Sequence, residues 1–221
     1  MADFERARIK MVENQLRANK VTDERLIEAM RALPRERFVP ASRRSVAYAD
    51  EDLSIGEGRW LMEPMLFARL AQLADVREGD LVLDVGAGLG YGAATLGRLA
   101  SAVVALEENA DLAAQAAEIA AGLEDGGGDN VVVQTGPLPA GWPDQAPYDV
   151  IFLEGAVEER PDSLLEQLAD GGRLVAMEAE AGGVQRGVVY LKRRGRCARR
   201  EAFDGSTPVL PGFARKPAFA F

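Results

Sequence analysis

The sequence predicts an α/β fold: a mostly parallel sheet of seven strands with helices on both faces, preceded by an N-terminal helical extension. From residue 80 onward, short apolar runs alternate with alanine-rich or leucine-rich helical segments. The first run ends at Asp84 and enters a glycine-rich turn, and the second ends at Glu107, 107 − 84 = 23 residues later. Acids and glycines at the carboxyl ends of such strands are typical of a crevice that binds a nucleoside-containing ligand.

The elements follow in order along the chain. Strands are predicted at 80–85, 102–107, 130–135, 148–153 and 172–178, and helices at 91–100, 109–122 and 161–169. The segments 188–191 and 198–203 predict a terminal antiparallel hairpin. Basic residues crowd its turn between 192 and 200. They either protect an edge strand by charge or form a patch for an acidic partner.

The region before residue 80 reads as helical, with one irregular segment. An amphipathic helix covers the first turns up to Leu16, and a second begins with Thr22 as its N-cap and stops at Pro34. No regular period is present over 36–64, and 65–73 is a short helix. The whole chain, 1–221, is interpreted as one domain, in which an extension (1–78) precedes a cofactor-binding core (79–221).

Composition narrows the class of protein. The 221 residues are 48% hydrophobic and 28% charged, as in globular proteins, and the net charge is −9. This charge disfavours binding to nucleic acid or to an anionic membrane. No run is long enough for a membrane span, and the first residues lack the apolar region of a signal peptide. The lone Cys197 points to a reducing compartment, so a cytoplasmic location is expected.

The chain contains no histidine. This excludes histidine-based catalytic triads and, together with the single cysteine, tetrahedral zinc sites, so no metal is expected. Chemistry must therefore depend on positioning a substrate against a cofactor, or on carboxylates.

The turn Gly86-Ala87-Gly88-Leu89-Gly90 distinguishes between cofactors. Its last two glycines are two residues apart, whereas the dinucleotide pattern separates them by three and places a pyrophosphate at a helix N-terminus. The turn instead resembles the nucleoside-binding loop of Rossmann-like methyltransferases, whose cofactor S-adenosylmethionine has no phosphate. The alternative is a glycine turn required only for packing.

Several stretches together resemble the protein-L-isoaspartate O-methyltransferase family. They are Met11-Val12-Glu13-Asn14-Gln15-Leu16, Pro34-Arg35-Glu36-Arg37-Phe38-Val39-Pro40, Ala47-Tyr48-Ala49-Asp50, Leu53-Ser54-Ile55-Gly56, the glycine turn, Gly141-Trp142 and the run 164–175. The resemblance implies a Rossmann-like class I methyltransferase that uses S-adenosylmethionine to methylate isoaspartyl residues in damaged proteins or peptides, as a monomer or weak dimer.

The resemblance also implies a donor site. Glu107 is expected to hold the ribose hydroxyls, and Glu154 either touches the donor's amino group or is an ordinary exposed acid at a strand end. The full set of donor-site residues is Asp84, Gly86, Ala87, Gly88, Tyr91, Glu107, Glu108, Gly136 and Glu154.

The chain departs from the family pattern at two places. Where the family carries a threonine and a serine that line the substrate pocket, this chain has Trp60 and Met62, neither of which bears a hydroxyl. These two residues are expected to form a lid over the methyl group or to fill the loop's core. Pro137 follows Gly136 where the family has an aspartate near the adenine.

Arg59 lies in the same altered loop and is expected to act as a catalytic residue with Trp60 and Met62. Its guanidinium could hold the substrate carboxylate in place of the missing hydroxyl, or it could form a salt bridge to Glu57, Glu63 or another surface acid. Because of the changes in this loop, an altered acceptor or a non-catalytic donor-binding protein are the alternatives to isoaspartyl repair.

Overall fold

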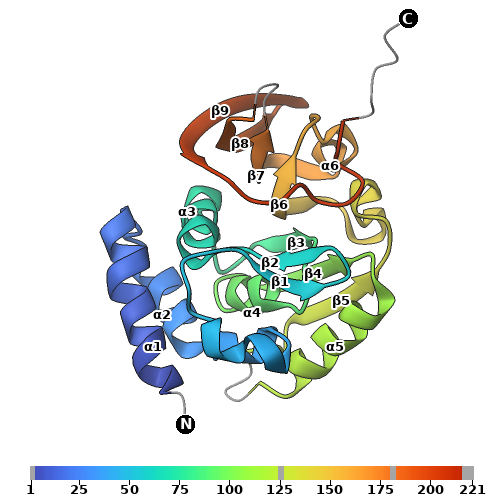
Figure 1. Ribbon diagram of the computed structural model, residues 1–221. Helices are drawn as coiled ribbons and strands as arrows, with labels where there is room; N and C mark the ends of the chain where they lie inside the picture. The colour runs from blue at the N-terminus through green and yellow to red at the C-terminus, as the bar shows by residue number, and fades with distance from the viewer. Residues whose placement is uncertain (1–2, 124–126, 180–182, 216–221) are drawn as a thin grey trace, which may run out of the picture.

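A seven-stranded sheet runs through the computed structural model, which describes residues 3–123, 127–179 and 183–215 (Figure 1). Its strands are β3 (Leu81–Val85), β4 (Ala102–Glu107), β5 (Val131–Thr135), β6 (Tyr148–Val157), β7 (Leu168–Ala179), β8 (Gln185–Arg193) and β9 (Arg196–Gly205). The order across the sheet is β5–β4–β3–β6–β7–β8–β9. The strands from β5 to β7 are parallel, and β8 is antiparallel to both β7 and β9. The mostly parallel sheet and its terminal hairpin are confirmed.

Helices and helical turns connect and cover these strands. The α-helices are α1 (Phe4–Met11), α2 (Glu24–Ala32), α3 (Pro64–Ala74), α4 (Tyr91–Gly97), α5 (Ala110–Ala121) and α6 (Asp162–Glu166). A π-helical turn spans Val12–Leu16, and 3-10 turns span Arg17–Asn19, Arg35–Phe38, Ala41–Val46, Leu138–Ala140 and Pro143–Gln145. The helix predicted at 161–169 is wrong at its end, because Leu168 already pairs with Tyr148 as the start of β7.

The sheet is buried on both faces, which explains the uninterrupted apolar runs of its strands. On one face, Val82 and Phe152 belong to a cluster that includes side chains of α2, α3 and α4. On the other face, Leu83 and Ile151 pack with α6 and with the segment that carries Leu210. The predicted helices on both faces are confirmed. None of the helices in the described ranges combines the length and apolarity that crossing a bilayer requires.

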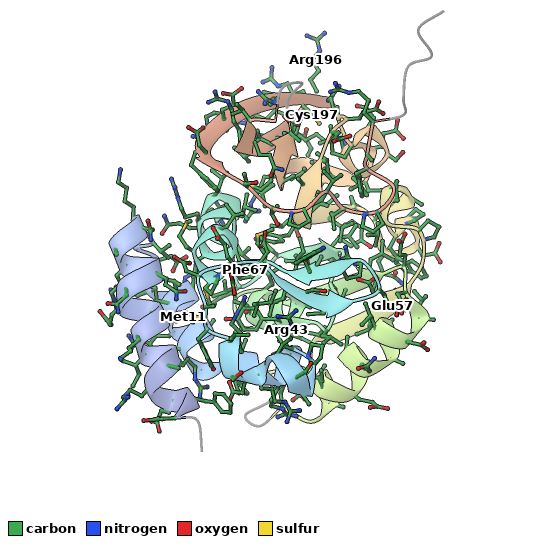
Figure 2. The ribbon with its side chains drawn as sticks, viewed as in Figure 1. Met11, Arg43, Glu57, Phe67, Arg196 and Cys197 are labelled. Atoms are coloured by element: carbon green, nitrogen blue, oxygen red, sulfur yellow. The ribbon has the colours of Figure 1, made fainter. Side chains whose placement is uncertain are left out.

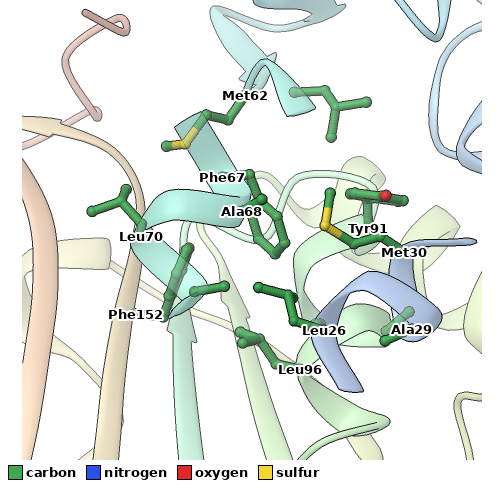
Figure 3. Close-up of a cluster of buried hydrophobic side chains, with 14 of the residues drawn as sticks. Leu26, Ala29, Met30, Met62, Phe67, Ala68, Leu70, Tyr91, Leu96 and Phe152 are labelled. Atoms are coloured by element: carbon green, nitrogen blue, oxygen red, sulfur yellow. The ribbon is translucent and has the colours of Figure 1, made fainter. Parts of the chain in front are cut away.

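Aromatic rings join the N-terminal region to the sheet (Figure 3). The ring of Phe67 on α3 lies 5.8 Å from that of Tyr91 on α4 and 5.2 Å from that of Phe152 on β6, measured between centroids. Arg173 on β7 donates to the carbonyl of Ala74 and pairs with Asp80. The extension predicted for 1–78 therefore shares one hydrophobic core with the remainder of the chain.

The N-cap of α2 is Asp23 and not Thr22. The Asp23 carboxylate accepts from the backbone N–H groups of Arg25 and Leu26. Thr22 instead bonds the side chain of Gln72 on α3. The sequence pattern identified the start of the helix to within one residue. Thr22 is engaged by Gln72, 50 residues away, and the next residue, Asp23, caps the helix.

Replacing Asp23 with alanine is expected to lower the free energy of unfolding by about 1 kcal/mol, because two N–H groups at the helix start lose their acceptor. Urea denaturation followed by circular dichroism measures it. Asn at the same position keeps an acceptor and serves as the control. A loss as large for Asn as for alanine would show that the charge, rather than the cap, matters.

A short hairpin occupies part of the segment that was expected to be irregular. Strands β1 (Leu53–Gly56) and β2 (Arg59–Leu61) form a separate two-stranded sheet, joined by a turn in which Gly56, Glu57 and Gly58 all have positive φ. Figure 1 shows the hairpin lying in front of β3 and β4. The prediction that 36–64 has no regular element is thus wrong for this hairpin. Strands of three or four residues give too short an alternation of apolar and polar residues to be detected in the sequence.

Strand β9 forms one edge of the sheet and is densely charged. Arg199 pairs with Glu178 on β7 and with Glu201 on its own strand. In Figure 2, Arg196 and Cys197 lie at the top of the view, apart from Glu57 at the tip of the β1–β2 hairpin. Lys192 donates to three carbonyl oxygens at and just after the end of α6. These contacts fit a hairpin whose charges protect an edge of the sheet.

Candidate active site

The glycine turn lies at the carboxyl end of β3 and is held against β4. The N–H groups of Gly86 and Ala87 both donate to the carbonyl of Leu106. Gly86 and Gly88 have φ values of +86° and +54°, in the left-handed region that favours glycine. A Cβ on Gly86 would lie 2.7 Å from Arg59 Nη2, and one on Gly88 would lie 2.6 Å from Ile55 Cδ1. The turn therefore needs glycine both for its conformation and for the close approach of the β1–β2 hairpin.

Glu107 ends β4 directly beside this turn and is fully buried. Its Oε2 accepts from the N–H of Gly88 at 2.8 Å, and its Oε1 accepts from the N–H of Asn109 at 3.1 Å. The structure thus places the carboxylate where a ribose acid was expected, at the end of the strand that neighbours β3.

Arg59 projects from the hairpin into the same place. Its guanidinium is 3% exposed, and Nε donates to both oxygens of Glu107, at 3.1 and 3.3 Å. Its Nη2 donates to the carbonyl of Gly86. The expected alternative of a salt bridge to Glu57, Glu63 or a surface acid is wrong, because the partner is a buried acid 48 residues away in sequence.

Trp60 and Met62, the neighbours of Arg59 in this segment, lie in different environments. Trp60 is 39% exposed on the outer side of the hairpin, whereas Met62 is 1% exposed within the main hydrophobic cluster. Met62 therefore fills the core, which is one of the two alternatives predicted from the sequence. Trp60 does not, since its ring faces solvent.

Two further acids, Asp84 and Glu154, form a buried pair near the turn. Asp84 is 0% exposed and Glu154 5% exposed, so the expectation of an exposed strand-end acid is wrong: β6 continues past Glu154 to Val157. Neither oxygen of Asp84 nor Oε1 of Glu154 has a donor in the described part of the chain. Gly92 makes room for the pair, because a Cβ there would lie 2.0 Å from Glu154 Oε1.

Burial sets the protonation of this pair. It raises the pKa of Asp84 to about 7, with Glu107 adding to the rise, and burial followed by the charge of Asp84 raises the pKa of Glu154 well above its ordinary value. Two carboxylates that lack donors can satisfy each other when they share one proton. Near neutral pH the pair therefore carries at most one negative charge.

A buried arginine packs against Tyr91 at the start of α4. Arg35 is 0% exposed, donates to the carbonyls of Ala47 and Met62, and stacks over the Tyr91 ring with its Cζ 4.7 Å from the centroid. Tyr91, expected at the donor site, is thus a core residue behind the glycine turn. Sequence reasoning assigned Arg35 no role, because its partners are 12 and 27 residues away and share no pattern with it.

The other expected residues divide between the strand ends around the glycine turn and the surface. Gly136 directly follows β5; it donates its N–H to the carbonyl of Glu107 at the end of β4 and faces the ring of Trp142. Ala87 is buried in the glycine turn. Glu108 is exposed and is not brought into this cluster.

Comparisons with known proteins agree with this geometry. The family model "Protein-L-isoaspartate(D-aspartate) O-methyltransferase (PCMT)" matches residues 6–202. The chain is 45% identical to "Protein-L-isoaspartate O-methyltransferase 2" of Anaeromyxobacter sp. (strain Fw109-5) over 85% of this chain and 76% of that protein. It is 40% identical to "Protein-L-isoaspartate O-methyltransferase" of Koribacter versatilis (strain Ellin345) over 92% of this chain and 90% of that protein.

Solved structures agree with the fold. A structure titled "protein-L-isoaspartate O-methyltransferase" superposes with a TM-score of 0.78 and 25% identity, covering 93% of this chain and 66% of that one. A Plasmodium falciparum protein in complex with S-adenosyl-L-homocysteine, 20% identical, also gives a TM-score of 0.78 and covers 95% and 99% of the two chains. The fold is therefore that of a Rossmann-like methyltransferase. By its sequence match over most of its length, the chain belongs to the protein-L-isoaspartate(D-aspartate) O-methyltransferase family.

Proposed function

We propose that the protein is an S-adenosylmethionine-dependent carboxyl O-methyltransferase that methylates isoaspartyl residues in damaged proteins and so starts their repair. The observation that carries this proposal is the glycine turn at the end of β3 with buried Glu107 beside it, in a chain of this family. The relatives described above bear the names of isoaspartyl methyltransferases. Those names do not favour a changed acceptor or a non-catalytic protein.

The residues at the crevice fit the methyl donor. Glu107 supplies carboxylate oxygens for the ribose hydroxyls, and the backbone of the turn from Gly86 to Gly88 permits close approach. Asp84 and Glu154 have buried oxygens without donors, which suit a cationic ligand such as the donor's methionine part. Gly136 is proposed to lie against the adenine, while Tyr91 supports the turn from behind; Ala87 and the exposed Glu108 complete the proposed set.

When bound, S-adenosylmethionine supplies a methyl group on a sulfonium. The acceptor carboxylate is already ionised at neutral pH, so the chain needs no general base, in keeping with its lack of histidine. The protein contributes by holding the acceptor carboxylate in line with the methyl group and the sulfur and by excluding water. Arg59 is proposed to hold the acceptor carboxylate, with Trp60 and Met62 on the same short segment at the acceptor side.

The setting follows from composition. The protein is proposed to act in the cytoplasm as a monomer or weak dimer, on polypeptides and not on nucleic acid. Its net charge of −9 repels phosphate backbones, and its single cysteine suits a reducing compartment.

A peptide containing one isoaspartyl linkage is expected to accept a methyl group, while the same peptide with a normal aspartyl linkage is not. The two peptides carry the same charge, so only the position of the carboxylate distinguishes them. Transfer of labelled methyl from S-adenosylmethionine, followed by its release as methanol at alkaline pH, measures ester formation. Equal labelling of both peptides, or of neither, contradicts isoaspartyl specificity.

A further inference from the structure

The β1–β2 hairpin lies over the glycine turn, where the donor is proposed to bind. Ile55 and Arg59, both nearly fully buried, extend from its inner side onto Gly88 and Gly86, and Leu210 closes over Gly86 from another direction. In the described residues the hairpin pairs only with itself and with no strand of the seven-stranded sheet. Side-chain contacts alone therefore hold it on this side against the glycine turn.

Arg59 uses the acceptor capacity that a ribose would need. A carboxylate offers about four acceptor positions. On Glu107, two of them receive the N–H groups of Gly88 and Asn109, and the single N–H of Arg59 Nε is shared between the two oxygens on the side that this arginine covers. The carbonyl of Gly86 is also taken, by Nη2 of the same arginine. Ribose hydroxyls cannot bind Glu107 until Arg59 leaves.

We propose that Arg59 is a latch that competes with the methyl donor for Glu107, so that the donor enters only when the hairpin releases this arginine. The inference rests on the proposed function, since it assigns Glu107 to the ribose. It also gives Arg59 two successive partners. The guanidinium pairs with Glu107 in the free protein, and after release it is available for the acceptor carboxylate.

The latch has a measurable consequence for donor affinity. A ligand that binds only one of two states binds more weakly in proportion to the fraction of that state. A latch closed in about nine molecules of ten weakens apparent donor binding about tenfold. Replacing Arg59 with methionine removes the guanidinium but keeps an unbranched apolar stem, so it abolishes the competition and leaves the donors of Gly88 and Asn109 on Glu107.

The test is calorimetric titration of S-adenosylhomocysteine into the wild-type protein and into the Arg59→Met variant. The variant is expected to bind S-adenosylhomocysteine at least about tenfold more tightly than the wild type. Glu57→Gln, which removes an exposed charge from the tip of the same hairpin, is expected to bind as the wild type does. Arg59→Leu, which likewise has no donor, carries the same expectation as Arg59→Met and replaces it if the methionine variant does not fold, as judged by circular dichroism.

The outcomes separate the latch from the proposed function. If both neutral Arg59 variants bind S-adenosylhomocysteine as the wild type does, or more weakly, the latch is overturned. In that case Arg59 either has no effect on the donor or assists its binding, and does not compete with it. An equal gain in affinity for S-adenosylhomocysteine in Glu57→Gln also overturns the latch, since the gain would then follow from the loss of any charge on the hairpin. No binding to any of the proteins at millimolar ligand overturns the donor site itself.

Discussion

Replacing Glu107 with alanine is expected to lower the free energy of unfolding by about 3–5 kcal/mol, the usual range when one partner of a buried ion pair is removed. The substitution leaves the guanidinium of Arg59 almost fully buried without an anion and the N–H groups of Gly88 and Asn109 without an acceptor. Denaturation in urea measures the loss. Binding of S-adenosylhomocysteine is expected to weaken as well, because a charge-assisted hydrogen bond contributes about 1.5–3 kcal/mol.

A double substitution separates the two causes of this loss. When Arg59→Met is added to Glu107→Ala, the buried charge disappears, and part of the stability is expected to return. Glu107→Gln keeps one acceptor oxygen and is expected to fall between the wild type and alanine. If Glu107→Ala alone stays within about 1 kcal/mol of the wild type, the pair with Arg59 is not formed in solution.

Asp84→Asn is expected to make the folded protein more stable than the wild type above pH 7. Burial raises the pKa of Asp84 to about 7 in the folded state, against about 3.9 in the unfolded chain. Between these values the unfolded state has lost a proton that the folded state keeps, so stability falls by about 1.4 kcal/mol per pH unit as the pH rises. Above the folded pKa the loss is complete. Asparagine does not titrate and avoids it.

Melting or urea midpoints of the two proteins from pH 4 to pH 9 measure this effect. The curves are expected to coincide near pH 4 and to separate progressively up to about pH 7, with no further separation above it. Asp129→Asn, at an exposed position, is expected to follow the wild type throughout. Parallel curves for Asp84→Asn would mean that this carboxyl is ionised in the folded state at all these values.

The sheet and the position of Glu107 beside the glycine turn could be predicted because their signals are local. The apolar run 81–83 ends in Asp84, and Glu107 ends the next strand, so hydrophobic pattern and chain order place both acids at one edge. The β1–β2 hairpin escaped prediction because its strands are short and its turn is rich in glycine. The pairing of Arg59 with Glu107 escaped because no local pattern joins residues 48 positions apart.

Burial was harder to predict than position. Glu154 follows the predicted end of its strand, where an acid is usually exposed, yet β6 continues and Gly92 opens a space for its side chain. Arg35 stands among charged neighbours in sequence and is fully buried in the fold. In both cases the decisive contact comes from another element, which a single sequence does not reveal without further sequences to compare.

The shared aromatic core restricts how proteins of this kind can diverge. Because Phe67 touches both Tyr91 and Phe152, the first 78 residues are not an interchangeable module that recombination could replace without rebuilding the sheet's packing. The outer side of the β1–β2 hairpin is under no such restriction, since Trp60 meets solvent. Point substitutions on this outer side would therefore leave the framework unchanged.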